Sequence, residues 1–391
     1  MLDCRSHPNF DDLCEMKIGI VCYPTFGGSG VVATELGKAL AIRGHQVHFI
    51  TYSMPVRLDF FSENIFYHEV AVSSYPLFDY APYESALTSK LVDVVRSEKL
   101  DLLHVHYAIP HASVAWLAKQ ILASYGIYIP IVTTLHGTDI TLVGKDLSYE
   151  PVVTFAINHS DGITAVSESL KRDTYANFKI EKDIRVIYNF VDLSRFGKKA
   201  NEQFKSMVAP NGEKLIVHTS NFRKVKRVED VVLVFDRIVK KMPAKLLLIG
   251  DGPERTAIEK LCREVGNCEH VRFMGRQEAV EEILSVCDLF IMPSESESFG
   301  LAALEAMACH VPVISTNTGG MPELNIHGVT GFLSNVGEVD DMARHALEIL
   351  SDTETLSRFK SAAALQAQKF DIHVVLPDYE NYYLDILERS K

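Results

Sequence analysis

The sequence predicts a doubly wound α/β protein with two parallel-sheet domains, and three observations lead to this prediction. The chain has 391 residues, more than the roughly 250–300 at which a single hydrophobic core stops growing. Short β-branched runs alternate with helical patterns throughout, which is typical of parallel strands joined by right-handed crossovers. The alternation restarts near residue 210 after a polar stretch, so each half is expected to supply its own sheet.

Each half contains its own series of expected strands. In the first half they are Lys17–Cys22, Gln46–Thr51, Leu102–His106, Ile129–Leu135, Gly162–Val166 and Arg185–Tyr188. In the second half they are Leu215–Thr219, Lys245–Ile249, Val271–Met274, Leu289–Met292 and Val311–Ser315.

One helix can be placed closely from its pattern. Val32, Leu36 and Leu40 recur four residues apart, and Gly44 follows them. An apolar residue every fourth position marks one helical face, and glycine favours the left-handed conformation just after a helix ends. We therefore expect a helix from about Val31 to Arg43.

Four segments are expected along the chain. Residues 1–15 are acidic and without periodicity, which indicates a disordered leader or a remnant of cloning. Residues 16–190 form the first domain and residues 191–371 the second. The polar stretch Asp192–Glu213 suits a linker containing the hinge. Residues 372–391 form a lone helix that is expected to pack back toward the first domain.

Composition narrows the class of protein. Hydrophobic residues make up 47% and charged residues 23%, with a formal net charge of −12. This balance is that of a globular protein, and the acidic surface disfavours nucleic acid and anionic membranes as partners. A local cluster of Arg and Lys can still bind a small anion.

The cysteines indicate a reducing compartment. There are seven, without a C-x-x-C pair, and an odd, scattered set fits free thiols in the cytoplasm. No apolar run reaches the roughly 18 residues of a membrane span, and the first residues lack the features of a signal peptide. We expect a cytoplasmic protein.

The most informative stretch is Pro293–Ala308, which closes a buried strand and opens a helix. Glu297 and Glu305 lie eight residues apart, about two helical turns, so both are expected to face one crevice at the carboxyl end of the sheet. Glu305 suits the two hydroxyls of a ribose, and Glu297 those of a sugar ring. Phe299, Gly300 and Leu301 would form the first turn, whose N–H groups favour a phosphate or hydroxyl. The alternative is that Ser294 and Ser296 cap the helix and both glutamates only face solvent.

A basic segment, Ser220–Arg227, follows the first strand of the second half. Arg223 and Lys226 are spaced to reach one diphosphate, although a solvated basic loop is the alternative. Gly250-Asp-Gly-Pro253 ends the next strand and leaves room for a ligand close to the backbone.

In the first half, Gly27-Gly-Ser-Gly30 precedes a helix but lacks the G-x-G-x-x-G and P-loop patterns, which argues against NAD and ATP. Gly28 and its neighbours can still contact a donor phosphate or an acceptor. His104 and His106 lie two residues apart on one strand, so their side chains point to the same face and could bind a metal ion together. Hydrogen bonds to neighbours are the more ordinary explanation, because neither carboxylate nor Cys completes a ligand set. No D-x-D motif for a divalent cation occurs, and Arg223 and Lys226 would replace the metal.

Taken together, these motifs resemble the retaining glycosyltransferases with two Rossmann-like domains facing across a cleft, family 4 of the GT-B class. Glu297 to Glu305 matches the family's E-x7-E element, and the resemblance covers about Met16 to the C-terminus. The glycine turn, the His136 segment, Tyr188–Asp192 and Gly250-Asp-Gly match further elements in order. Tyr23–Val32 and Ser220–Arg223 look most like the branch that transfers N-acetylglucosamine from its UDP donor to L-malate, in bacillithiol biosynthesis.

The resemblance implies a role for each matched residue. Glu305 would bind the ribose, Glu297 with the backbone of Phe299, Gly300 and Leu301 the sugar, and Arg223 with Lys226 the diphosphate. Backbone near Arg276 would contact the uracil, and His136 would lie beside the sugar. The set proposed for the acceptor is Ser29, Tyr107, Thr138 and the amides of the glycine turn. Phe190 and His310 stand where relatives commonly have Gly, and a left-handed conformation is expected at His310.

The implied reaction needs no cofactor, no metal and no protein base. The acceptor hydroxyl would attack from the leaving-group face while a donor phosphate oxygen takes its proton. Glu297 and His136 would position the sugar and stabilise the transition state electrostatically. Three alternatives stay open: another small acceptor such as a sugar or inositol phosphate, a UDP-sugar 2-epimerase, and a non-catalytic nucleotide-sugar sensor. Whether the chain forms a homo-oligomer is also left open.

Overall fold

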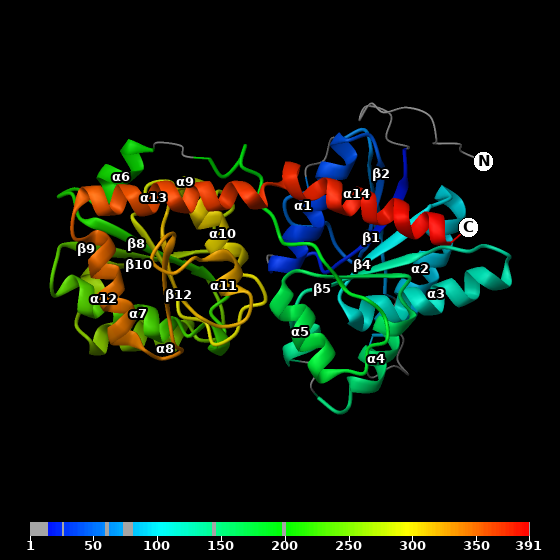
Figure 1. Cartoon of the computed structure of the whole chain (residues 1–391), viewed down its shortest axis with the longest axis horizontal. Helices are drawn as coiled ribbons and strands as arrows, with labels where there is room; N and C mark the ends of the chain where they lie inside the picture. Colours follow the sequence, from blue (N-terminus) through cyan, green and yellow to red (C-terminus); the bar gives the residue numbers. More distant parts are fainter. Residues whose placement is uncertain are drawn as a thin grey trace. The chain divides into compact units, whose positions relative to one another are not determined.

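The computed structural model describes residues 15–25, 27–58, 62–72, 81–142, 146–197 and 201–390. The predicted leader therefore lies outside the described residues, apart from Glu15. The chain divides into two compact units, which are drawn in Figure 1. The first unit comprises Met1–Ala165, Lys171–Ile187 and Leu376–Lys391, and the second comprises Val166–Leu170 and Tyr188–Val375. Both units are thus assembled from separate stretches of sequence.

The first unit contains a seven-stranded sheet in which all neighbours are parallel. Its spatial order is β3 (Ile65–Glu69), β2 (Gln46–Thr51), β1 (Lys17–Val21), β4 (Leu102–His106), β5 (Ile131–Leu135), β6 (Gly162–Ala165) and β7 (Arg185–Val186). The order reverses direction between β1 and β4, and this is the switch point at which doubly wound sheets bind ligands.

The second unit repeats the plan with a six-stranded parallel sheet. Its order is β10 (Val271–Gly275), β9 (Ala244–Gly250), β8 (Lys214–Ser220), β11 (Leu289–Met292), β12 (Val313–Thr316) and β13 (Gly331–Ser334). Here the switch point lies between β8 and β11. The predicted class, two doubly wound Rossmann-like domains, is confirmed.

Helices fill the crossovers. In the first unit they are α1 (Gly28–Ile42), α2 (Tyr83–Glu98), α3 (Ser113–Ser124), α4 (Glu150–His159) and most of α5 (Glu168–Asn177). In the second unit they are α6 (Glu202–Val208), α7 (Val228–Val239), α8 (Arg255–Glu264), α9 (Val280–Leu284), α10 (Leu301–Ala308), α11 (Met321–Leu324), α12 (Val339–Leu350) and α13 (Thr353–Ala367). The last helix, α14 (Ile372–Arg389), begins at the predicted residue and ends at Arg389, two residues before the end of the predicted segment.

Two strands were not predicted from the sequence, and the observed bounds of several other elements differ from the predicted ones. β3 is a half-exposed edge strand and β13 an edge strand of four residues, so neither shows the long apolar run that reveals a central strand. β5 and β12 begin at Ile131 and Val313, later than expected, because the prolines just before them cannot donate to a sheet.

Helix α1 begins three residues earlier than its apolar pattern predicts. Gly28, Ser29 and Gly30 form its first turn, and the Val31 N–H donates to the Gly27 carbonyl at 3.2 Å. A Cβ at Gly30 would lie 2.5 Å from the carbonyl oxygens of Tyr23 and Thr25. Glycine is therefore required for close packing of the helix start against the end of β1. At the other end Gly44 adopts the predicted left-handed conformation, with φ +95°.

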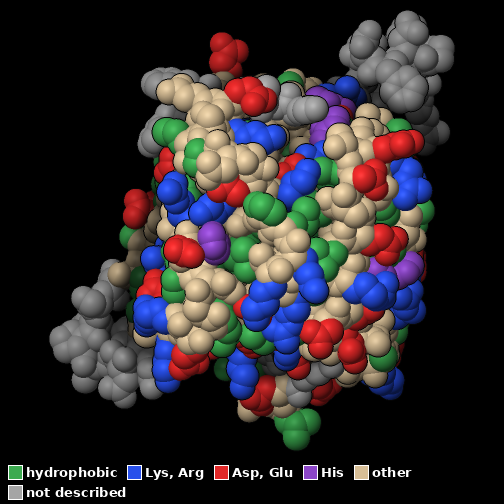
Figure 2. Space-filling view, turned by 90° about the vertical axis from the view of Figure 1, so that its left-hand side faces the viewer, with side chains coloured by type: hydrophobic (Ala, Val, Ile, Leu, Met, Phe, Trp, Pro, Cys, Tyr) green, Lys and Arg blue, Asp and Glu red, His purple; other side chains and the backbone are tan. Residues whose placement is uncertain are grey.

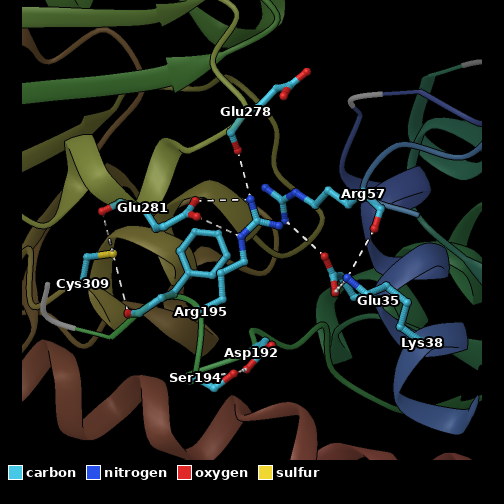
Figure 3. Close-up of polar contacts among 10 residues, drawn as sticks. Glu35, Lys38, Arg57, Asp192, Ser194, Arg195, Glu278, Glu281 and Cys309 are labelled. Carbon is cyan, nitrogen blue, oxygen red and sulfur yellow. Dashed lines mark hydrogen bonds and ion pairs between the residues drawn. The ribbon is translucent and has the colours of Figure 1, made fainter. Parts of the chain in front are cut away.

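The stretch expected to be a linker belongs to the second unit. Arg195 places its guanidinium on the Glu281 carboxylate of α9, at 3.2 and 3.3 Å, and donates to the Glu278 carbonyl at 3.0 Å (Figure 3). Phe196 is buried, and the Cys309 thiol donates to its carbonyl. Because these contacts fix the segment to α9 and α10, the chain passes between units earlier, between Ile187 and Tyr188.

The last helix is tied to the first unit by buried polar contacts. The hydroxyl of Tyr383 lies 2.7 Å from His104 Nδ1, and the Ile163 N–H donates to the Tyr382 hydroxyl at 2.8 Å. Glu380 accepts from Arg43 and lies 3.2 Å from His45 Nε2. The expectation that this helix returns to the first domain therefore agrees with the division into units.

Acidic and basic side chains are interspersed over the face of the molecule shown in Figure 2, without a broad region of one sign. Among the described residues, no helix has both the length and the apolar character needed to cross a bilayer.

Candidate active site

One candidate site lies in the second unit, at the carboxyl ends of β8 and β11. The basic segment follows β8, and the loop carrying Glu297 follows β11. The two strands are neighbours in the sheet, so the segments meet although they are far apart in sequence. The amide of Glu295 donates to the Val225 carbonyl at 2.8 Å and joins the two loops directly.

Glu297 is a buried carboxylate held by two side chains. It is 9% exposed. Its Oε1 lies 2.5 Å from Lys226 Nζ and accepts a hydrogen bond from the Ser294 hydroxyl at 2.8 Å. Its carbonyl accepts from the Gly320 N–H at 2.9 Å. A buried charge needs such partners, so the loop holds this carboxylate in one place. The serine predicted as a possible helix cap binds Glu297 instead.

The helix after this loop begins later than predicted. α10 starts at Leu301, and Gly300 before it has φ +96°, so Phe299 and Gly300 are not part of a helical turn. The eight-residue spacing of Glu297 and Glu305 is thus not two helical turns. The reason is that the left-handed conformation of Gly300 prevents the helix from beginning earlier. A Cβ at Gly300 would lie 2.3 Å from Met321 Sδ. Glu305, at 7% exposure, is as buried as Glu297.

The side chain of Phe299 anchors the Glu297 loop by packing against other aromatic rings. Its ring is buried and lies 6.0 Å from the ring of Tyr188 and 5.4 Å from that of Phe370. This aromatic packing fixes the backbone on which the predicted contacts of Phe299, Gly300 and Leu301 depend.

The basic residues differ in their surroundings. Arg223 is exposed and, within the part of the chain that the structure describes, makes no ion pair, whereas Lys226 is paired with Glu297. Arg227 donates to Asp230 at 2.7 Å, and this bond raises its pKa. Lys224 is exposed as well, so Arg223, Lys224 and Lys226 are the cations of this segment that face the Glu297 loop or solvent, whereas Arg227 has a structural partner.

The turn after β9 packs directly on the start of the basic segment. A Cβ at Gly250 would lie 1.8 Å from the Ser220 carbonyl oxygen, and one at Gly252 would lie 2.0 Å from that of Asn221. These glycines permit backbone to approach backbone. Arg276 is exposed and follows Gly275, which has φ +65° at the end of β10. The Arg276 segment thus lies two strands from the switch point.

A second candidate site lies in the first unit, at the carboxyl ends of β1, β4 and β5. Tyr107 follows β4 with φ +85°, and its hydroxyl lies near the side chains of Ser29 and Thr138 and interacts with both. All three residues were predicted to bind the acceptor, and the structure brings them together. Burial raises the pKa of Tyr107 to about 12, so its hydroxyl stays protonated. Gly28 is exposed in the first turn of α1 beside Ser29.

The histidines of this unit form hydrogen bonds to neighbours, as the simpler explanation predicted. His104 Nε2 lies 2.7 Å from the Thr134 hydroxyl, and His106 Nδ1 lies 2.8 Å from His136 Nε2. Burial lowers the pKa of His136 to about 3, so the imidazole is neutral and acts through hydrogen bonds. No three His, Cys, Asp or Glu side chains gather as a metal site among the described residues.

Asp139 belongs to the segment that begins at His136, and no role was predicted for it from the sequence. Its Oδ2 accepts from the Ala108 N–H at 2.9 Å, and its Oδ1 accepts from the N–H groups of Gly137 and His136 at 3.0 and 3.3 Å. It therefore joins the loops that carry Tyr107 and His136. Burial raises its pKa to about 6, against the opposing effect of these donors. Its place in His136-Gly-Thr-Asp139, three residues after the histidine, was the available signal.

Comparison with known proteins gives family matches for both halves of the chain. Residues 26–195 match the family described as Glycosyltransferase Family 4, and residues 199–366 match Glycosyl transferases group 1. The N-acetyl-alpha-D-glucosaminyl L-malate synthase of Bacillus anthracis is 48% identical over 380 residues, covering 96% of this chain and 99% of that protein.

Solved structures share the fold at low sequence identity. A sucrose-phosphate synthase from Thermosynechococcus elongatus superposes with a TM-score of 0.81 at 20% identity, over 96% of this chain and 100% of that one. Anabaena HepE in complex with UDP-glucose gives 0.78 at 21% identity, again over 96% and 100%. From its two family matches and its full-length relative, the chain belongs to glycosyltransferase family 4.

Proposed function

We propose that this glycosyltransferase transfers N-acetylglucosamine from UDP-N-acetylglucosamine to the hydroxyl of L-malate, the first step of bacillithiol biosynthesis. The observation that carries the proposal is the 48% identity, over nearly the full length of both chains, to an enzyme named for this product. The L-malate acceptor follows from that relative's name. The donor is supported as well by the charged site at the end of the second sheet.

The second unit is proposed to bind the donor. Lys226 lies beside Glu297, and a diphosphate is attached directly to the anomeric carbon of its sugar. One cation and one carboxylate in contact therefore suit the junction between diphosphate and sugar. Arg223 would add a second cation, Glu305 would bind the ribose, and backbone near Arg276 would contact the uracil.

The first unit is proposed to bind the acceptor. The hydroxyls of Tyr107, Ser29 and Thr138 form one cluster, and hydroxyl groups can donate to the carboxylates of malate. The exposed amide of Gly28 belongs to the first turn of α1, where free N–H groups favour anions.

We propose retention of configuration without a metal ion. The malate oxygen forms its bond to the anomeric carbon on the face from which UDP leaves, and its proton passes to a donor phosphate oxygen. Arg223 and Lys226 stabilise the charge that develops on UDP. Glu297 and neutral His136 hold the sugar during transfer. The five described cysteines are free thiols, as a reducing cytoplasm would leave them.

The test is incubation of the protein with UDP-N-acetylglucosamine and EDTA, with and without L-malate. We expect UDP release that depends on malate, a product with the mass of N-acetylglucosaminyl malate, and an α-anomeric proton coupling by NMR. Malate-independent conversion of the sugar would indicate an epimerase. Turnover only with a sugar or inositol phosphate would replace the acceptor, and UDP binding without any turnover would indicate a sensor.

A further inference from the structure

His218, a buried imidazole on β8, lies between the two loops of the proposed donor site. It is fully buried, and its ring centroid lies 6.3 Å from that of Phe222 and 6.2 Å from that of Phe290. Its Nδ1 is 2.8 Å from the carbonyl oxygen of Ile291 on β11, and its Nε2 is 2.8 Å from the Ser220 hydroxyl. The ring thus connects β11, just before the Glu297 loop, to the start of the basic segment.

The direction of each hydrogen bond is determined. A carbonyl oxygen only accepts, so Nδ1 carries the proton and donates to Ile291. Burial lowers the pKa of His218 to about 4, so the ring is neutral and Nε2 is an acceptor. The Ser220 hydroxyl must therefore donate its single proton to Nε2. Its oxygen in turn accepts from the Phe222 N–H at 3.3 Å.

This chain of bonds ends on a backbone that would not adopt its conformation unaided. Phe222 has φ +38°, a left-handed conformation that costs energy for a residue with a side chain. Its carbonyl accepts from the Glu254 N–H at 3.0 Å, so the residue is held on both sides. Arg223 follows immediately, and Lys226 lies one turn later.

We infer that His218, acting through Ser220, is a positioning residue that sets the geometry of the diphosphate-binding segment. The inference rests on the proposed donor role of Arg223 and Lys226. Without the Ser220 hydroxyl, the Phe222 N–H loses its acceptor and the left-handed turn relaxes. Arg223 and Lys226 then no longer converge on one diphosphate, while the distant uracil contacts are unaffected.

The experiment compares the affinities of UDP and uridine for Ser220→Ala and the wild type, by calorimetry for UDP and ligand-observed NMR for uridine. We expect UDP affinity to fall about tenfold, the effect of losing one hydrogen bond, while uridine affinity is unchanged. Ser220→Thr retains the hydroxyl and should restore UDP binding. His218→Asn keeps a donor for Ile291 but cannot reach Ser220, and should behave like Ser220→Ala.

Thr219→Val is the matched control. Thr219 precedes Ser220 on the same strand, and its buried hydroxyl finds no partner in the described part of the chain. Its isosteric replacement should leave both affinities unchanged. A merely structural role for Ser220 predicts equal losses for UDP and uridine with a lowered melting temperature, and that result, or unchanged UDP binding, overturns the inference.

The same data separate this inference from the proposed reaction. If the wild type binds UDP but forms no product with malate, the reaction is wrong, and the affinities still decide the role of His218 and Ser220. If the wild type binds no UDP, the donor site and the inference are both overturned.

Discussion

The two units place their candidate residues at corresponding points of similar sheets, but with different chemistry. At the β8–β11 switch point of the second unit, a lysine and a buried glutamate form a charged pair. At the β1–β4 switch point of the first, the neutral hydroxyls of Tyr107, Ser29 and Thr138 lie near one another. The histidine beside them, His136, is neutral as well because burial lowers its pKa.

Under the proposed function, the topology fixes where each ligand binds and the loops fix which ligand it is. A nucleoside diphosphate carries its charge close to the bond that breaks, so cations and a fixed carboxylate are useful there. An acceptor hydroxyl must reach the anomeric carbon without being ionised in advance. Neutral donors can orient it without adding a competing charge. The predictions below test this division, from the largest expected effect to the smallest.

The charged pair should matter most for turnover. Glu297→Gln removes the carboxylate that holds Lys226, and we expect kcat to fall by about 10²–10³-fold, as for loss of one preorganised polar group in other active sites. Steady-state kinetics with saturating donor measure this. Glu295→Gln changes an exposed carboxylate of the same loop and should leave kcat near the wild-type value. Full turnover by Glu297→Gln would remove it from the mechanism.

Asp139, a buried carboxyl group that joins the loops of Tyr107 and His136, has a pKa of about 6 against an ordinary 3.8. Because the folded state keeps this proton to higher pH, its contribution to stability is present below about pH 4 and lost as pH rises through 6. Relative to Asp139→Asn, the wild-type free energy of unfolding should fall by up to about 3 kcal/mol between pH 4 and 7.

Denaturant unfolding at several pH values measures the Asp139 effect. Asp183→Asn is the control, because this carboxyl group of the same unit has a largely exposed side chain and its replacement should leave the pH dependence unchanged. Parallel pH profiles for the wild type and Asp139→Asn would contradict the raised pKa.

Arg223 tests whether the exposed cation contributes to donor binding. Arg223→Ala should weaken UDP binding by about tenfold to a hundredfold, in the range for a hydrogen bond to a charged group. The loss should shrink as salt rises, since salt screens an exposed charge. Lys224→Ala removes an exposed neighbouring charge and serves as the control. Equal losses in both variants would indicate general attraction rather than a specific contact.

Tyr107→Phe should have the smallest effect and act only on the acceptor. The change removes a hydroxyl that lies near Ser29 and Thr138, so we expect the KM for L-malate to rise about threefold to tenfold, with UDP affinity unchanged. Tyr125→Phe alters an exposed tyrosine at the end of α3 and should change neither. A rise in the KM for the donor would indicate that Tyr107 contacts the donor and not the acceptor.

Much of the fold could be predicted because local sequence patterns determine most of its strands and helix ends. Most central strands appear as short β-branched runs, and Gly44 ends α1 in the conformation expected of glycine. His310 likewise adopts the expected left-handed conformation, with φ +62°. The half-exposed strand β3 was missed because its residues do not form an apolar run.

The sequence by itself determined the two-sheet class, the glycine-rich stretch at the start of α1 and the loop that carries Glu297. Only the tertiary structure decided what these residues contact. Glu297 is paired with Lys226, 71 residues away in sequence, and the proton of His218 is placed by the carbonyl of Ile291, 73 residues away. Partners and proton positions depend on distances of a few ångströms between remote segments. No local pattern encodes such distances, because they are set when β8 and β11 become neighbours in the folded sheet.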